Sequence, residues 1–205
     1  MKKMIAIMAL AALSGSALAG DWNEVGDAGG LPPGQHTVGA GSLDRILGAL
    51  DAGAQDFEDM YCIRIVNPQA FSATTVGGAS FDTQLFLFDA NGLGVSHNDD
   101  AGGLQSRITG QFVLIPGIYH LAISGYNRDP LDAAGGLIWN NSPFGTERAP
   151  DGPAAANPIA GWGGTGGTGA YTITLTGAEF CQVPAPGVMA ILGLGGLAAA
   201  RRRRA

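Results

Sequence analysis

The chain has 205 residues, with 11 basic and 17 acidic side chains, so its formal net charge is −6 at pH 7. An acidic surface repels phosphate groups, which argues against nucleic acid as a partner. The length between the two ends suffices for one hydrophobic core, so we expect a single folded domain of about 150 residues.

The first 19 residues have the order of features typical of a secretory signal peptide. Lys2 and Lys3 precede an apolar run from Met4 to Leu13, and the small residues Ala17-Leu18-Ala19 follow. This pattern predicts export, with cleavage before Gly20. The alternative is a buried N-terminal helix.

The next segment contains few regular signals. Gly, Pro and acidic residues dominate residues 21–41, which predicts an extended lead-in. Residues 42–50 are ambiguous, because Leu43, Ile46 and Leu50 have helical spacing, whereas residues 46–50 could equally form a strand.

Three runs then predict strands. Residues 61–66 alternate, with Tyr61, Ile63 and Ile65 on one face. Residues 71–76 and 83–88 follow, and the run Leu85-Phe-Leu-Phe88 is apolar on both faces, which predicts a central strand covered on both sides.

Two further strands are expected over residues 108–115 and 118–124, as a hairpin around Pro116-Gly117. Residues 127–169 lack regular signals, and a loop this long predicts a functional, mobile or partly disordered insert, centred on residues 130–169. Residues 171–176 alternate most clearly, with Tyr171 facing inward, and are expected to be the closing strand.

These runs predict an antiparallel β-sandwich of about eight strands. Four motifs occur in order: Asp56-Phe-Glu-Asp-Met-Tyr61, Asp82-Thr-Gln-Leu85, Asn98-Asp-Asp100 and Pro116-Gly-Ile-Tyr119. This ordered set resembles the bacterial pre-peptidase C-terminal domain family. The resemblance spans roughly residues 21–180, implies a jelly-roll-like domain over residues 20–183, and favours a strand over residues 46–50.

Two cysteines, Cys62 and Cys181, lie outside the terminal segments. Export places them in an oxidising compartment, and the first and last strands of a sandwich are often neighbours, so we expect a disulfide. The alternative is two inert thiols. A metal or redox role is disfavoured, since there is no C-x-x-C pair and no histidine near either cysteine in the sequence.

Residues 184–205 have the features of a second targeting signal. The motif Pro184-Ala185-Pro186 leads into an apolar run over residues 188–200, and the chain ends in the cluster Arg201, Arg202, Arg203 and Arg204. This order resembles the PEP-CTERM sorting signals, with Ala185 where that family usually has Glu. The resemblance implies an exosortase-like membrane protease as partner, with transient inner-membrane anchoring by a C-terminal transmembrane helix. A permanent C-terminal membrane anchor is the alternative.

Without the two terminal targeting segments, the remaining chain has five arginines, no lysine and 17 carboxylates, for a formal net charge of −12. Divalent cations and neutral glycans are therefore the expected partners. His36, His97 and His120 belong to no catalytic motif, and His97 and the pair Asp99-Asp100 are interpreted as a solvated turn. We therefore expect a protein that is not an enzyme.

The family resemblance also implies a calcium site. Carboxylates from the lead-in and from a D-x-x-D pair hold calcium in collagenase-type relatives, and oxygen ligands supplied by loops suit Ca²⁺. The corresponding residues here are Asn23, Glu24, Asp27, Asp56 and Asp59. The alternative is a solvated acidic turn.

Three aromatic residues in or beside the insert, Tyr126, Trp139 and Trp162, could stack on sugar rings, or they could pack into the protein. The expected function is an exported, non-catalytic protein of the cell surface or extracellular matrix, with exopolysaccharide as a partner. The alternatives are a calcium-stabilised carbohydrate- or protein-binding module and a hydrolase accessory domain.

Overall fold

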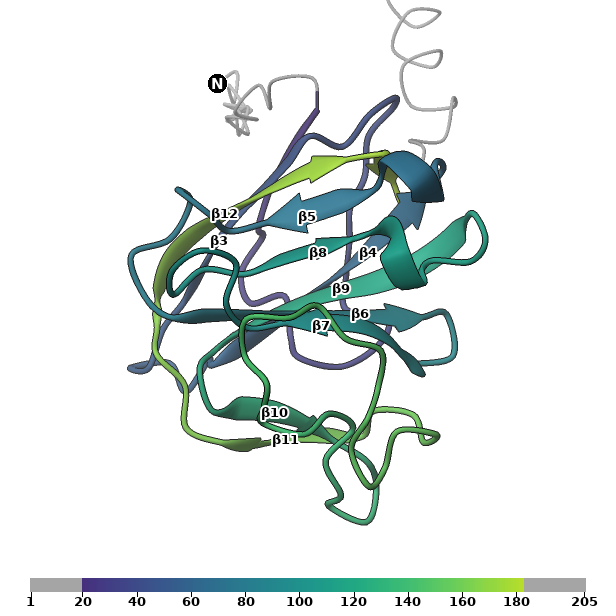
Figure 1. Cartoon of the computed structure of the whole chain (residues 1–205). Helices are drawn as coiled ribbons and strands as arrows, with labels where there is room; N and C mark the ends of the chain where they lie inside the picture. Colours follow the sequence, from purple (N-terminus) through teal and green to yellow (C-terminus); the bar gives the residue numbers. More distant parts are fainter. Residues whose placement is uncertain (1–19, 183–205) are drawn as a thin grey trace, which may run out of the picture.

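The computed structural model describes residues 20–182, which form an all-β, sandwich-like fold (Figure 1). One sheet has the strand order β1 (Asp21–Asn23), β3 (Arg45–Leu50), β12 (Gly169–Thr176), β5 (Ser72–Thr74) and β8 (Arg107–Thr109). The other has the order β13 (Ala178–Phe180), β4 (Glu58–Ile65), β9 (Gly117–Gly125), β6 (Thr83–Asp89) and β7 (Gly94–Asn98), with β2 (Gln35–His36) beside β4. A separate pair joins β10 (Arg128–Leu131) to β11 (Gly161–Gly164), and the 3-10 turns are η1 (Pro68–Ala70) and η2 (Gly110–Phe112).

The main core lies between the two sheets. Tyr61 and Ile63 of β4 are fully buried and belong to the same apolar cluster as Tyr171 and Ile173 of β12. The alternation predicted for both strands is therefore confirmed. The ambiguous segment is strand β3, in which Ile46 pairs with Ile173 and is fully buried.

The segment after β10 covers the outer face of the six-stranded sheet. Phe86 and Phe88 of β6 point away from the main core and pack with Ile138 and Trp139 in a second apolar cluster. The prediction that β6 is covered on both faces is confirmed. The insert, expected to be functional, mobile or partly disordered, packs on the sheet through buried apolar side chains, and its residues 140–146 are exposed.

The predicted hairpin around Pro116-Gly117 is also wrong. Strand β8 pairs with β5 in one sheet, whereas β9 pairs with β4 and β6 in the other. Between them the chain turns through η2, where Gly110 lies against the carbonyl of Pro68 and a larger residue would collide with it. The chain therefore crosses from one sheet to the other instead of folding back.

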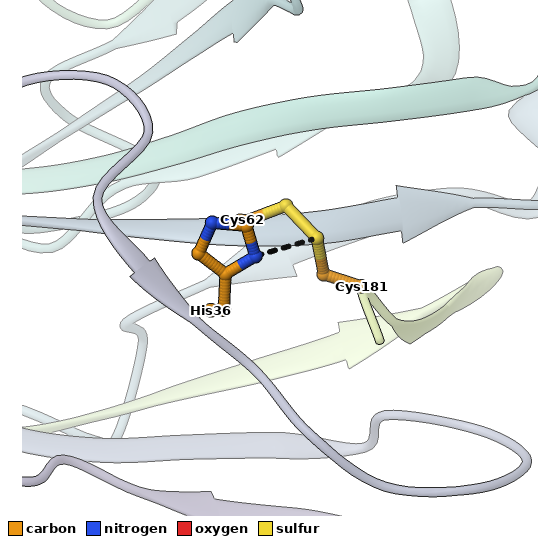
Figure 2. A group of neighbouring side chains, drawn as sticks. All are labelled: His36, Cys62 and Cys181. Atoms are coloured by element: carbon orange, nitrogen blue, oxygen red, sulfur yellow. Dashed lines mark hydrogen bonds between the residues drawn. A yellow bond between two sulfur atoms is a disulfide. The ribbon is translucent and has the colours of Figure 1, made fainter. Parts of the chain in front are cut away.

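The predicted disulfide is present. Cys62, in the middle of β4, is bonded to Cys181, which follows β13, and the two Cα atoms are 5.5 Å apart. Figure 2 shows the His36 ring against this bond, with Nδ1 3.7 Å from the Cys181 Sγ. No histidine lies near either cysteine in the sequence, but the fold brings one close, because β2 pairs with β4 and places His36 opposite Cys62.

The predicted signal peptide and the predicted sorting tail, residues 1–19 and 184–205, lie outside the described residues. No helix between residues 20 and 182 is long and apolar enough to cross a membrane. The predicted transmembrane helix therefore stays a prediction about the tail alone.

Candidate metal centre

Three of the expected calcium ligands come together at one end of the sandwich. Glu24 follows β1, Asp56 precedes β4 and Asp59 lies near the start of β4. One carboxylate oxygen of each lies within 4.8 Å of the others. The fold therefore joins the lead-in to the D-x-x-D pair, as the family resemblance implied.

Asp59 is the innermost member of this group. Its side chain is fully buried, and its Oδ2 accepts a hydrogen bond of 2.5 Å from the Tyr171 hydroxyl. The Tyr61 and Tyr171 hydroxyl oxygens are 2.6 Å apart, so Tyr61 can donate to Tyr171 in turn. Asp59 Oδ1 has no hydrogen-bond partner. A buried carboxylate oxygen without a donor is costly, and a cation would satisfy it.

Backbone donors and a glycine shape the outer side of the group. Glu24 accepts hydrogen bonds from the backbone N–H groups of Ala28 and Ala49, at 3.1 and 3.0 Å. Gly48, which pairs with Tyr171, leaves room there, since a Cβ atom at this position would lie 2.7 Å from Glu24 Oε2 and still closer to the Tyr171 hydroxyl. The absence of a side chain at Gly48 thus lets the Glu24 carboxylate and the Tyr171 hydroxyl both lie close to β3.

The charges in this group are not balanced by arginine. The three arginine–carboxylate ion pairs found within residues 20–182 are Arg45–Asp21, Arg128–Glu58 and Arg148–Asp151, so none involves Glu24, Asp56 or Asp59. Burial, reinforced by the neighbouring carboxylates, raises the pKa of Asp56 to about 6 and that of Asp59 well above its usual range. Such shifts arise where like charges are crowded and desolvated.

The other two predicted ligands are more exposed than these three. Asn23 is exposed on β1. Asp27 is exposed too, and its Oδ1 accepts a hydrogen bond from the Gly29 backbone N–H at 2.6 Å. Asp27 still raises the pKa of Asp56 through its charge. The candidate metal centre is therefore Glu24, Asp56 and Asp59, which fit a hard cation such as Ca²⁺ because all three offer carboxylate oxygen.

Sequence reasoning missed the role of Tyr171. It predicted this residue as an inward apolar side chain of the closing strand, and the ring is indeed buried. A buried tyrosine needs a partner for its hydroxyl, and that requirement could have indicated a polar group on the opposite sheet. Nothing in the sequence marked Gly48.

The aromatic trio does not form one ligand surface. Trp139 is 2 % exposed and packs in the second core cluster. Trp162 is half-buried, and its indole N–H donates to the Gly30 carbonyl at 2.6 Å. Only Tyr126 presents much of its ring to solvent. Trp139 therefore packs into the protein, as the alternative prediction had it, and it forms part of the apolar contact between the insert and β6.

The solvated turn expected around His97 is wrong as well. His97 is buried in β7 and its ring stacks on Phe86, with ring centroids 4.4 Å apart. Burial lowers its pKa to about 3, so the ring is neutral near pH 7. Asp99 is also buried, with 2 % of its surface exposed, because the insert covers this end of β7.

The phenol at position 171 provides a first test of the metal centre. Tyr171→Phe removes the donor to Asp59 Oδ2, which leaves both oxygens of a buried carboxylate unpartnered. We expect the calcium-free variant to lose about 1 to 3 kcal/mol of unfolding free energy. Added calcium should recover part of that loss. Urea denaturation in EDTA and in calcium measures both values, and an equal loss in the two conditions would contradict the expectation that calcium takes the place of the Tyr171 donor at Asp59.

Compared with known proteins, the chain matches no family model, no curated protein and no solved structure. The chemistry of the site therefore rests on the residues of this chain alone. They offer oxygen ligands for a hard cation and a tyrosine pair that holds the innermost carboxylate.

Proposed function

We propose that the protein is an exported, non-catalytic domain of the cell surface or extracellular matrix, calcium-stabilised and delivered by its C-terminal tail. In this proposal the domain is a jelly-roll-like one that resembles the pre-peptidase C-terminal family, and its tail acts as a PEP-CTERM-type sorting signal. The observation that carries it is the disulfide between Cys62 and Cys181. Structural disulfides persist in oxidising compartments outside the cytosol.

The position of the disulfide suits a domain held by its C-terminus. β13 has three residues and lies at the edge of its sheet, so few backbone hydrogen bonds secure it. Cys181 follows β13 directly, and the bond ties this point to β4, which pairs with β9 along eight residues. Tension from an anchor beyond residue 182 would pass to β4 rather than peel β13 away.

The sorting part of the proposal predicts the mature ends. A short apolar helix before four arginines would stall with its basic end inside, which presents Pro184-Ala185-Pro186 to an exosortase-like protease at the outer face. We expect the mature protein to begin at Gly20 and to lack residues 188–205. Intact mass spectrometry of the native exported protein measures both ends. An intact Arg201–Arg204 cluster on surface material would reject processing and favour a permanent anchor.

One observation favours a second function, a carbohydrate-binding module. Tyr126 and Phe144 are 37 % and 38 % exposed, and their ring centroids are 5.8 Å apart. Exposed aromatic faces can stack on neutral sugars, which a surface with an excess of carboxylates does not repel. A matrix protein that contacts exopolysaccharide would combine both functions.

A glycan array tests this second function. We expect Tyr126→Ala and Phe144→Ala each to lose binding to a neutral polysaccharide by about tenfold, since each aromatic contact contributes about 1 kcal/mol or more. Leu114→Ala is the control, because Leu114 is 89 % exposed and apolar but not aromatic. Equal binding by all three variants would exclude the ring pair as a glycan site.

A further inference from the structure

A second group of carboxylates lies at the same end of the six-stranded sheet as the first. Asp82 comes just before β6, and Asp99 and Asp100 come just after β7, its antiparallel neighbour. One oxygen of each lies within 4.8 Å of the others. Ser124 of β9 pairs with Glu58 on one side and Gln84 on the other, so β9 runs between the two acidic groups.

The second group differs from an ordinary acidic turn because it contains buried oxygens without donors. Asp99 is 2 % exposed, and its Oδ1 has no hydrogen-bond partner. Asp82 Oδ1 and the amide oxygen of the buried Gln84 have none either. Between residues 20 and 182, the remaining buried side-chain oxygen in this condition is Asp59 Oδ1, in the first group.

Gln84 is placed to belong to the second group. It precedes Leu85, which pairs with Asn98, and Asp99 follows Asn98, so Gln84 and Asp99 lie across from each other where β6 and β7 separate. The Gln84 amide nitrogen is 3.4 Å from Asp129 Oδ1, so the amide oxygen is its free acceptor. Gln84 therefore adds a buried amide oxygen without a donor at the position opposite Asp99, next to the three grouped carboxylates in the register of the strands.

Hydrogen bonds hold the segments that carry these side chains. Asn98 donates from Nδ2 to the Asp100 carbonyl at 3.1 Å, and its Oδ1 accepts from the Arg107 backbone N–H at 2.9 Å. The Asp100 N–H donates to the Phe144 carbonyl, and the Tyr126 N–H donates to the Asp82 carbonyl. These backbone and side-chain hydrogen bonds therefore keep Asp82, Asp99 and Asp100 close together, although their charges repel one another.

Among residues 20–182 no arginine forms an ion pair with Asp82, Asp99 or Asp100, although the charge of the buried Arg148, which pairs with Asp151, acts to lower the pKa of Asp99. Burial, together with Asp100, Asp82 and Asp129, raises the pKa of Asp99 to about 7. The pKa values of Asp82 and Asp129 are raised as well, chiefly by burial. A group of desolvated like charges costs stability unless a cation or protons neutralise it.

We infer that Asp82, Gln84, Asp99 and Asp100 form a second divalent-cation site, distinct from the candidate metal centre and of the calcium type. Calcium accepts six to eight oxygens in irregular arrangements from carboxylates, amide carbonyls and water. The ion joins the start of β6 to the end of β7. Through the Asp100–Phe144 hydrogen bond, it also fixes the insert that covers this face.

Counting bound calcium tests the site. Native mass spectrometry and titration calorimetry on the disulfide-bonded mature protein, with calcium chloride as the probe, should give two ions per chain. Asp99→Asn should bind one, Asp59→Asn should bind one, and the double variant none. Glu179→Gln, which removes a half-buried carboxylate on β13, is the matched control and should retain two.

Two results would overturn the second site. One is a single ion in the unaltered protein that Asp59→Asn abolishes, and the other is an undiminished count in Asp99→Asn. If Asp99→Asn does not fold, Asp100→Asn replaces it, since Asp100 is half-buried, and it should weaken one of the two sites by about tenfold or more through the lost ligand charge. An unchanged affinity at both sites in that folded variant would equally reject the proposal.

Discussion

Reduction of the Cys62–Cys181 bond is expected to lower the unfolding free energy of the mature protein by about 4 to 5 kcal/mol. The bond joins residues 119 positions apart, and the entropy that such a cross-link removes from the unfolded chain rises with the length of the closed loop. Measured losses for native disulfides range from about 2 to 5 kcal/mol. Since small domains have about 5 to 15 kcal/mol in all, the reduced protein should be close to its stability limit.

Urea denaturation with and without reductant measures this loss on one and the same sequence. Thiol titration at each urea concentration verifies the redox state, because Cys62 is buried and its bond can resist reductant until the fold opens. The double variant Cys62→Ala/Cys181→Ala provides a state without the cross-link at all times. A midpoint shared by the oxidised protein and the double variant would show that the bond adds no stability.

Residue patterns predicted the parts of this fold that depend on local periodicity. Tyr171 and Ile173 alternate with Thr172 and Thr174, and the run from Leu85 to Phe88 has no polar position, so burial on one face and on two faces could be predicted from sequence. The disulfide was predicted from the expected export and from the usual proximity of first and last strands, and β13 does pair with β4.

The predictions that proved wrong depend on contacts between segments far apart in the chain. An apolar run on either side of Pro116-Gly117 satisfies the pattern of a hairpin, but residues 110–112 form η2, which packs against η1, and β8 pairs with β5 in the other sheet. The local sequence around Asp99 is typical of a hydrated turn, whereas in the structure the insert covers this residue. Whether a carboxylate is hydrated depends on what packs over it, and local sequence does not contain that information.

In the candidate metal centre, too, local motifs could be predicted from the sequence and contacts between distant segments could not. Asp56 and Asp59 were found from their spacing, and Glu24 from its place in the lead-in, because the family resemblance supplied the pairing. Tyr171 comes from the opposite sheet, 112 residues after Asp59, and no spacing rule connects the two. The exposure of Asn23 depends on the register of β1 against β3, which the sequence left undetermined.

Calcium is expected to stabilise the protein more strongly as the pH rises. In the calcium-free fold the pKa of Asp56 is raised to about 6 and that of Asp99 to about 7, and the pKa of Asp59 is also raised, in each case mainly by burial. In the unfolded chain these carboxyls titrate near pH 3.9. Between about pH 4 and the folded pKa values the native state therefore holds more protons, so its stability falls as the pH rises through that window.

Bound calcium should offset this fall in stability, because it interacts with the deprotonated carboxylates of the native state. At a free concentration about 100 times the dissociation constant, one site adds about 2.7 kcal/mol. For a domain of this size that is a rise in Tm of about 5 to 10 °C. At pH 5 the gain should be smaller, since the ion must displace protons first. Calorimetry between pH 5 and pH 8 should show Tm falling in EDTA and nearly level in calcium.

Asp59→Asn separates this linkage from general screening of the −12 charge. Asparagine has the same shape but no titratable proton, so the EDTA profile should become less steep and the calcium-dependent rise in Tm at pH 8 should shrink. Magnesium at matched ionic strength should stabilise both proteins less than calcium does, and Glu179→Gln should behave like the unaltered chain. If Asp59→Asn keeps the full pH slope and the full calcium shift, Glu24, Asp56 and Asp59 hold no ion, and their carboxylates are only an acidic edge of the sandwich.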